Sequence, residues 1–358
     1  MTSTAIALRR LAQQRLAARP LATAAEVVAW LGAVQAQDYP GAKWALGQRM
    51  RAATDDAIER AFSDGAILRT HVMRPTWHFV TPADIRWMLA LTAPRVNAAM
   101  AYYFRQFELD DALFARTNAV IAAALQGGQH LTRAELGTAL ARAGINATGT
   151  RLAHIVSRAE LDAVVCSGPR RGKQFTYALL DERVPPARPL SRDEALAELT
   201  RRYFMSHGPA TVRDFTWWSG LTVASAKAGL DMAGSALSQE TLGGQPHWFA
   251  PSELSAAAPS HAPYLLPTYD EFLVGYAAFD ATRRGGEQRG QGARAPLTFD
   301  APLVIGGQVA GNWRRSFQRG TVVFERAPFA PLTAAEDAAV TAAAERYGQF
   351  LGMPVALA

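Results

Sequence analysis

At 358 residues the chain exceeds a single hydrophobic core, so the sequence predicts two to four structural units, and no apolar run approaches the roughly 20 residues needed to span a bilayer. Cys166 is the only cysteine, which excludes an intrachain disulfide and a cysteine-built zinc site; with no signal-peptide pattern at the N-terminus, this favours a reducing cytoplasm. The formal net charge of +6 favours an anionic partner such as nucleic acid, although charge alone identifies none.

The first unit is expected over residues 1–109, with a winged-helix-like order of elements. Helices are predicted at Leu21–Val34, at Asp55–Phe62 and at Pro82–Leu91, with strands at Ile67–His71 and Thr76–Val80. The same pattern is compatible with a different small fold.

Gln35, Gln37 and Asp38 lie where the first long apolar helix is expected to end. Pro40 disfavours helix at the residue before it, so the cluster is predicted at a helix C-terminus or in the following turn. Two amides separated by one apolar residue can orient a water and contact a nucleotide. They can also satisfy the free carbonyl groups of a helix end, and spacing alone favours this structural role.

Two histidines, His71 and His78, flank the turn between the predicted strands of the first unit. Strand alternation does not decide whether they share a face of the sheet. A scaffolding role, with Trp77 and Phe79 in the core, is favoured over a catalytic role. Seven histidines without a cysteine partner or an HExxH-type pair argue against a metal site.

The clearest winged helix-turn-helix pattern covers residues 110–183. Thr132 and Glu135 form a capping box before a helix predicted at Arg133–Arg142, and a second helix is predicted at Arg151–Asp162. Two β-favouring runs then surround the turn at Gly168–Lys173, which predicts a hairpin with a basic tip.

A third unit of the same kind is predicted over residues 190–250. Ser191 with Glu194 and Thr211 with Asp214 form capping boxes for two helices, and a third helix is predicted at Thr222–Met232. A weaker strand pair follows.

After residue 260 the sequence pattern changes to short β-favouring runs separated by glycine turns. This predicts a small β-barrel over residues 260–358, with a final helix at Thr333–Leu351. One of the strands is expected at Glu271–Tyr276. Asp270 and Glu271 would then point to opposite faces, one of them toward a site. The fold class is therefore α+β: tandem winged-helix units, three in number, followed by a β-barrel.

Candidate DNA contacts are basic residues on turns and on a polar segment at residues 281–295. These are Arg74, Arg170, Arg171, Lys173, Arg283, Arg284, Arg289 and Arg294.

Three segments resemble the AlkZ-like bacterial DNA glycosylases: the Gln-Ala-Gln at residues 35–37, the stretch from Leu68 to Val80, and the stretch from Tyr269 to Tyr276. The resemblance covers most of the chain in the expected order. It implies tandem winged helices in a C-shape with a C-terminal β-barrel, and excision of N7-alkylated purines, including unhooking of interstrand crosslinks. Gln35 and Gln37 match the catalytic Gln–apolar–Gln motif of the family. A sister branch has Asp at the third position.

The chemistry that the resemblance implies suits neutral amides. An N7-alkylated purine is cationic, so its glycosidic bond is already activated and the enzyme need only place water and stabilise the oxocarbenium ion. Two glutamines can then serve where ordinary glycosidases use two carboxylates. Asp38 is a candidate base, although a solvated turn aspartate is the favoured interpretation.

These observations predict a metal-free, cofactor-free, monomeric and cytoplasmic glycosylase acting on double-stranded DNA, with His71, His78 and Asp270 as candidate supporting residues. Two rivals remain. One is a non-enzymatic winged-helix transcriptional regulator, against which tandem non-identical units argue. The other is a protein whose winged helices contact only protein. The sequence contains no glycine-rich loop of the kind that binds the phosphates of a nucleotide cofactor.

Overall fold

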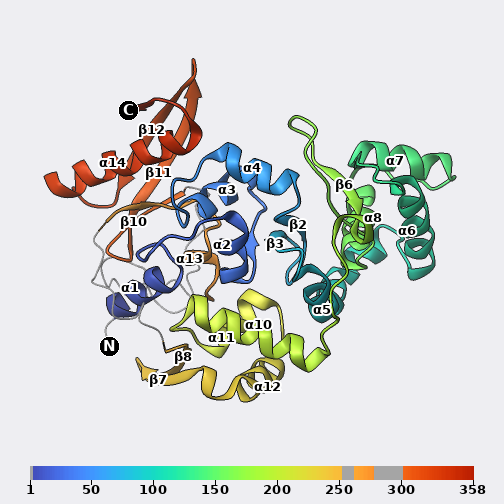
Figure 1. Ribbon diagram of the computed structural model, residues 1–358, viewed down its shortest axis with the longest axis horizontal. Coiled ribbons are helices and arrows are strands. Elements are labelled where there is room, and N and C mark those ends of the chain that lie inside the picture. Colours follow the sequence, from blue (N-terminus) through green and yellow to red (C-terminus); the bar gives the residue numbers. More distant parts are fainter. Residues whose placement is uncertain (1–2, 252–261, 278–300) are drawn as a thin grey trace.

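The computed structural model describes residues 3–251, 262–277 and 301–358, and its architecture is mixed α and β, as predicted. In Figure 1 the N-terminal elements, in blue, occupy the centre. The C-terminal sheet and helix α14 lie on one side of them and the segment containing α6–α8 on the other, while α10–α12 lie beneath.

The N-terminal segment forms a helical layer around a three-stranded sheet of order β1-β3-β2. Its elements are α1 (Ser3–Gln13), α2 (Ala24–Leu31), β1 (Val34–Gln35), α3 (Tyr39–Gly47), α4 (Asp55–Ser63), β2 (Leu68–His71), β3 (Trp77–Val80) and α5 (Ile85–Gln106). The strands at β2 and β3 and the helix α4 are confirmed. The helix predicted at Leu21–Val34 is wrong at its end, because Gly32 adopts φ +84° and turns the chain into β1.

The middle segment matches the predicted order of elements. It contains α6 (Asp111–Leu125), β4 (Leu131–Thr132), α7 (Arg133–Arg142), α8 (Gly149–Leu161), β5 (Val165–Ser167), β6 (Thr176–Leu179) and α9 (Leu180–Arg183). The capping box of Thr132 and Glu135 is present. The three strands of the middle segment form a sheet of order β4-β6-β5. Local signals helped here because α6 and α7 begin at side-chain caps, Asp110 and Thr132, whereas α8 begins without a capping hydrogen bond.

The third segment contains α10 (Arg192–His207), α11 (Val212–Ser219), α12 (Val223–Ala233), a 3-10 turn η1 (Gly234–Ala236), β7 (Ser238–Leu242) and β8 (Gln245–Phe249). Both predicted capping boxes are present. The strand pair that the sequence only weakly indicated is a two-stranded antiparallel sheet.

The C-terminal segment is an open, curled sheet rather than a closed barrel over the described residues. It contains β9 (Tyr264–Leu265), α13 (Glu271–Val274), β10 (Ala301–Ile305), β11 (Gln308–Gln318), β12 (Thr321–Pro328), α14 (Ala334–Leu351) and β13 (Val355–Leu357). The strand order is β13-β12-β11-β10-β9, with β13 parallel to β12. The strand predicted at Glu271–Tyr276 is wrong: Asp270 caps the short helix α13 by accepting a hydrogen bond from the backbone N–H of Phe272.

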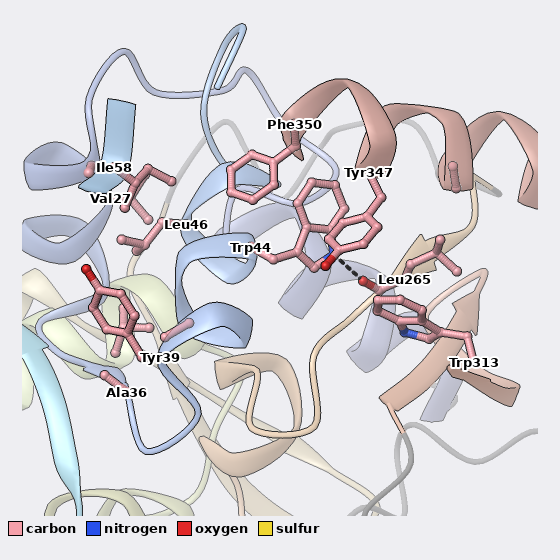
Figure 2. Close-up of a cluster of buried hydrophobic side chains, with 14 of the residues drawn as sticks. Val27, Ala36, Tyr39, Trp44, Leu46, Ile58, Leu265, Trp313, Tyr347 and Phe350 are labelled. Carbon is pink, nitrogen blue, oxygen red and sulfur yellow. Dashed lines mark hydrogen bonds between the residues drawn. The ribbon is translucent and has the colours of Figure 1, made fainter. Parts of the chain in front are cut away.

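One hydrophobic core joins the two ends of the chain. Figure 2 shows Trp44 of α3 against Tyr347 and Phe350 of α14, with Trp313 of β11 nearby. The indole N–H of Trp44 donates to the backbone oxygen of Leu265 at 2.6 Å, so its polar atom is satisfied inside this core. The N-terminal sheet therefore rests on C-terminal elements.

The remaining cores follow a different division of the chain. The residues around α10–α12 share a core with β2 and α5, whereas α6, α7 and α8 enclose a core largely their own. Among the described helices, none is long and apolar enough to cross a membrane.

Candidate active site

Gln35 occupies a short buried strand, not the helix end that the sequence suggested. It is 8% exposed, and its backbone N–H donates to Glu271 Oε1 at 2.7 Å. Its side-chain oxygen is buried and has no hydrogen-bond partner among the residues that the structure describes. Gln35 therefore does not lie at a helix end, and its amide oxygen is a buried acceptor without a partner in the described chain.

A row of polar side chains crosses the N-terminal sheet at Gln35. In the antiparallel register Gln35 lies opposite His78, and His78 lies opposite Thr70. Residues directly opposite in antiparallel strands project from the same face. Buried Gln35 Oε1, His78 Nε2 and Thr70 Oγ1 all lack hydrogen-bond partners within the described ranges. We call these three residues the polar row. Buried polar atoms are normally satisfied, so three adjacent exceptions indicate a place for water or ligand.

His78 is neutral within the polar row. Burial, followed by the charge of Arg74, lowers the pKa of His78 to about 3. Its Nδ1 lies 2.9 Å from the backbone oxygen of Thr76, and because a carbonyl only accepts, Nδ1 carries the proton. The Nε2 of the neutral ring is consequently an acceptor.

The two histidines of the hairpin lie on opposite faces of the sheet. His71 pairs with Trp77, in the alternate register to His78. The Nδ1 of His71 bonds the carboxylate of Glu160 in α8, and the indole N–H of Trp77 lies 3.4 Å from the same carboxylate. His71 therefore ties the N-terminal sheet to the middle segment, away from the polar row.

Glu271 is a buried carboxylate directly behind Gln35. Its Oε1 accepts from the Gln35 backbone, its Oε2 accepts from the indole N–H of Trp218 at 2.9 Å, and His207 Nε2 lies 3.5 Å from Oε2. Burial alone raises the pKa of Glu271, but the contact with His207, the N–H of Gln35 and the charge of Arg74 outweigh it and lower the pKa. Glu271 is therefore an anion at neutral pH.

Asp270 is also buried, yet it faces away from Gln35. Its two oxygens accept from the guanidinium of Arg49 at 2.7 and 2.8 Å, and both side chains are fully buried. Arg49 also donates to Gln14. Of the adjacent acids, Glu271 reaches the site, and Asp270 holds the C-terminal segment to α1 and α3.

Arg74 brings a cation to the turn beside the polar row. Its Nε and Nη2 are buried without hydrogen-bond partners in the part of the chain that the structure describes. Burial lowers the pKa of Arg74, and the charge of Glu271 opposes this. Gly220 lies against the same turn, because an added Cβ there would come within 2.3 Å of the Met73 backbone oxygen.

Gln37 and Asp38 lie at the surface, just beyond Gln35. Gln37 is exposed and Asp38 is partly exposed at the position before α3, where its side chain makes no capping hydrogen bond. Pro40 lies in the first turn of α3, where proline is favoured; the expectation that it disfavours helix at Tyr39 is wrong, because α3 begins at that residue.

The basic hairpin of the middle segment is partly committed to internal contacts. Arg170 pairs with Glu59 at 3.1 Å and lies over the rings of Tyr39 and Phe175. Arg171 is half exposed and pairs with Glu135 at 2.7 Å, whereas Lys173 is exposed. Four further candidate contacts, Arg283, Arg284, Arg289 and Arg294, lie outside the described residues.

Sequence reasoning did not assign Glu271, Trp218, His207 or Thr70 to the site. The signal for Glu271 was an acid directly before the apolar run from Phe272 to Tyr276, but the predicted strand left the direction of its side chain open. The other three become neighbours only through the tertiary fold. Among the described residues, no group of three or more His, Cys, Asp and Glu could hold a metal ion.

Comparison with known proteins gives a consistent result. A curated relative from Streptomyces sahachiroi, described as an interstrand DNA cross-link repair glycosylase, is 26% identical over 317 residues, covering 85% of each chain. The solved structure of Streptomyces sahachiroi DNA glycosylase AlkZ matches the whole of both chains with a TM-score of 0.82 at 23% identity, so the fold is shared. The family model for AlkZ-like DNA glycosylases matches residues 28–350. This chain belongs to the AlkZ-like DNA glycosylases, hydrolases that act on N-glycosyl bonds.

Proposed function

We propose that this protein hydrolyses the N-glycosidic bond of N7-alkylated purines in double-stranded DNA, including purines joined in interstrand crosslinks, with Gln35 and Gln37 positioning the attacking water. The observation that carries the proposal is the buried, unsatisfied oxygen of Gln35 in the polar row, beside an anionic carboxylate. The similarity to an interstrand DNA cross-link repair glycosylase from Streptomyces supports crosslinks as substrates.

The polar row suits a water nucleophile. Gln35 Oε1 and His78 Nε2 are both acceptors on neighbouring strands, so one water can donate a proton to each and turn a lone pair outward. Attack at the sugar C1′ breaks the bond to the base. The base leaves neutral because the alkyl group already made it cationic, and the proton of the attacking water passes to solvent. Gln37, which is exposed at the protein surface next to the polar row, contacts the water or the sugar from the solvent side.

DNA binding in this proposal uses the described cations beside and around the site. The guanidinium of Arg74, with two unpartnered nitrogens, receives a phosphate near the lesion, and Arg171 and Lys173 contact the backbone farther away. Residues 1–109, 110–183 and 190–250 are proposed as three winged-helix units and residues 260–358 as a barrel-like unit of a monomeric, cytoplasmic enzyme. A role limited to transcriptional regulation is not favoured for a member of a glycosylase family.

The test is excision from a labelled duplex containing N7-methylguanine, and unhooking of a nitrogen-mustard crosslink. Alkali-labile sites are expected with wild type, with a decrease of at least about tenfold, roughly 1.4 kcal/mol of barrier, in both Gln35→Ala and Gln37→Ala. Gln126→Ala, an exposed glutamine at the end of α6, is the matched control and should leave the rate unchanged. A wild-type protein that binds both duplexes without cleaving either would refute the proposal.

A further inference from the structure

We propose that Glu271 is a positioning residue that fixes Gln35 through its backbone and supplies the fixed negative charge that makes the site selective for a cationic sugar or base. This inference rests on the proposed glycosylase function and assigns a role that the Gln-Ala-Gln motif does not contain.

The Glu271 carboxylate joins three elements of the fold. Two elements donate to the carboxylate, β1 through the Gln35 N–H at 2.7 Å and α11 through the Trp218 indole at 2.9 Å, while α10 places His207 Nε2 at 3.5 Å. The carboxylate is fully buried and cannot move without breaking these contacts. It therefore holds the strand that carries Gln35, and hence the side-chain amide of Gln35 within the polar row.

Glu271 carries a negative charge beside Gln35. Glu271 is ionised, and its neighbour His207, whose pKa burial lowers, lies 3.5 Å away without a hydrogen bond to it among the described residues. Arg74 acts on both Glu271 and His78, but two of its guanidinium nitrogens have no hydrogen-bond partner in the described chain. When a DNA phosphate occupies Arg74, the negative charge of Glu271 is left for the substrate. An N7-alkylpurine and an oxocarbenium ion are both cations, so this charge stabilises both.

Glu271 differs in its partners from Asp270, the residue before it. Asp270 is equally buried, but Arg49 neutralises it through two hydrogen bonds of 2.7 and 2.8 Å. The charge of Asp270 is therefore neutralised by Arg49, and its carboxylate does not contact Gln35. The two neighbours therefore form a natural matched pair, one acid for stability and one for the site.

The experiment measures binding to two uncleavable duplexes, one with a cationic pyrrolidine abasic analogue and one with a neutral tetrahydrofuran abasic analogue. Wild type is expected to prefer the pyrrolidine duplex by at least about tenfold, and Glu271→Gln should reduce this ratio to about one. Asp270→Asn, compared per folded molecule, should keep the preference. A structural role alone would change both affinities together and leave their ratio unchanged.

Glu271→Asp separates the charge from the backbone contact, and it is measured whether or not Glu271→Gln folds. It keeps the charge but is too short to reach the Gln35 N–H, so it should retain the pyrrolidine preference within about threefold while single-turnover excision of N7-methylguanine falls at least about tenfold. Retention of the preference in Glu271→Gln, or its loss in Glu271→Asp, would overturn the inference.

The two proposals fail differently. If wild type excises N7-methylguanine but shows no preference for the cationic analogue, the role of Glu271 is wrong and the glycosylase function stands. If wild type excises neither lesion, the proposed function itself is wrong.

Discussion

His78 lies in the middle strand of the N-terminal sheet with its imidazole fully buried between Gln35 and Thr70. Its Nδ1 is bonded to its own chain, and its Nε2 is left as an acceptor. A buried neutral histidine lowers the free energy of unfolding in acid, because the imidazole binds a proton in the unfolded chain but not in the native state. The same feature that suits the site therefore limits the stability of the protein.

This cost is measurable by comparing wild type with His78→Gln. The pKa of His78 falls from about 6.5 in the unfolded chain to about 3 in the native state, so its contribution to stability is full above pH 6.5 and is lost as the pH falls toward 3. Between pH 7.5 and 4.5, wild type should lose about 3 kcal/mol more unfolding free energy than His78→Gln. Urea denaturation at both pH values tests this, and equal losses in the two proteins would contradict it.

Part of the site could be predicted from the sequence at this scale. Gln35 and Gln37 came from the resemblance to a family motif, whereas spacing alone favoured a structural role for them. The roles of His71 and His78 depended on strand register, which a sequence does not fix across a turn of uncertain length. Glu271 meets Gln35 across 236 positions of the chain, and no local pattern encodes that contact.

Among the elements, those with their own caps were predicted best. Helices α7, α10 and α11 each begin at a capping box that is readable within four residues, and all three formed as expected. The two-residue strand β1 exists only because β3 pairs with it. The short helix α13 carries the apolar run of a strand, and the aspartate cap at Asp270 decides its conformation.

The contact between α11 and the β2–β3 turn gives a prediction for Gly220. This glycine ends α11 at φ +70°, and a Cβ would come within 2.3 Å of the Met73 backbone oxygen. Gly220→Ala should lose about 3 kcal/mol of unfolding free energy and should slow excision, because Trp218 would shift from Glu271. Urea denaturation and single-turnover assays give the two readouts.

Gly144→Ala is the matched control for Gly220→Ala. Its φ is +72°, but no atom lies within 4 Å of the added Cβ, so only the conformational cost of about 1 kcal/mol is expected. If both variants lose the same free energy, the close approach of α11 to the turn does not matter for stability.

The hairpin between β5 and β6 combines two kinds of basic residue. Lys173→Ala should leave stability unchanged and reduce the slope of log affinity against log salt for duplex DNA by about one, because it removes one phosphate contact. Arg170→Ala should instead lose about 1 kcal/mol of stability, since Arg170 pairs with Glu59 and covers Tyr39, and should leave the slope unchanged. A reduced salt slope in Arg170→Ala and an unchanged slope in Lys173→Ala would instead indicate that Arg170 contacts the DNA.

Across the whole molecule, the cores do not follow the order of the chain. The first segment shares its core with the C-terminal sheet and α14, while the middle segment packs largely on itself. The sequence predicted unit boundaries near residues 110, 190 and 260, where the pattern of helix and strand signals changes. These signals contained no information on which segments would pack together, because each apolar face is compatible with many partners.

This arrangement predicts that a change in α14 weakens the site, although α14 carries no site residue. Phe350→Ala should lose about 3 to 4 kcal/mol and should lower the hydrogen-exchange protection of the Gln35 amide, because Phe350 packs on Trp44 of α3. Leu136→Ala removes a fully buried side chain from the middle core and should lower protection in α6–α8 while sparing Gln35. Equal effects of both changes at Gln35 would indicate a single cooperative unit.

The hydrogen bond between Gln35 and Glu271 also has a consequence for protein synthesis. A ribosome adding about 5 to 20 residues per second needs roughly 12 to 50 seconds to make the intervening chain. During that interval the nascent protein carries both motif glutamines but neither the carboxylate behind them nor the C-terminal sheet beneath them. A product that terminates before residue 271 would have the same defect, so competence to cut a glycosidic bond is acquired only after the C-terminal segment has been made.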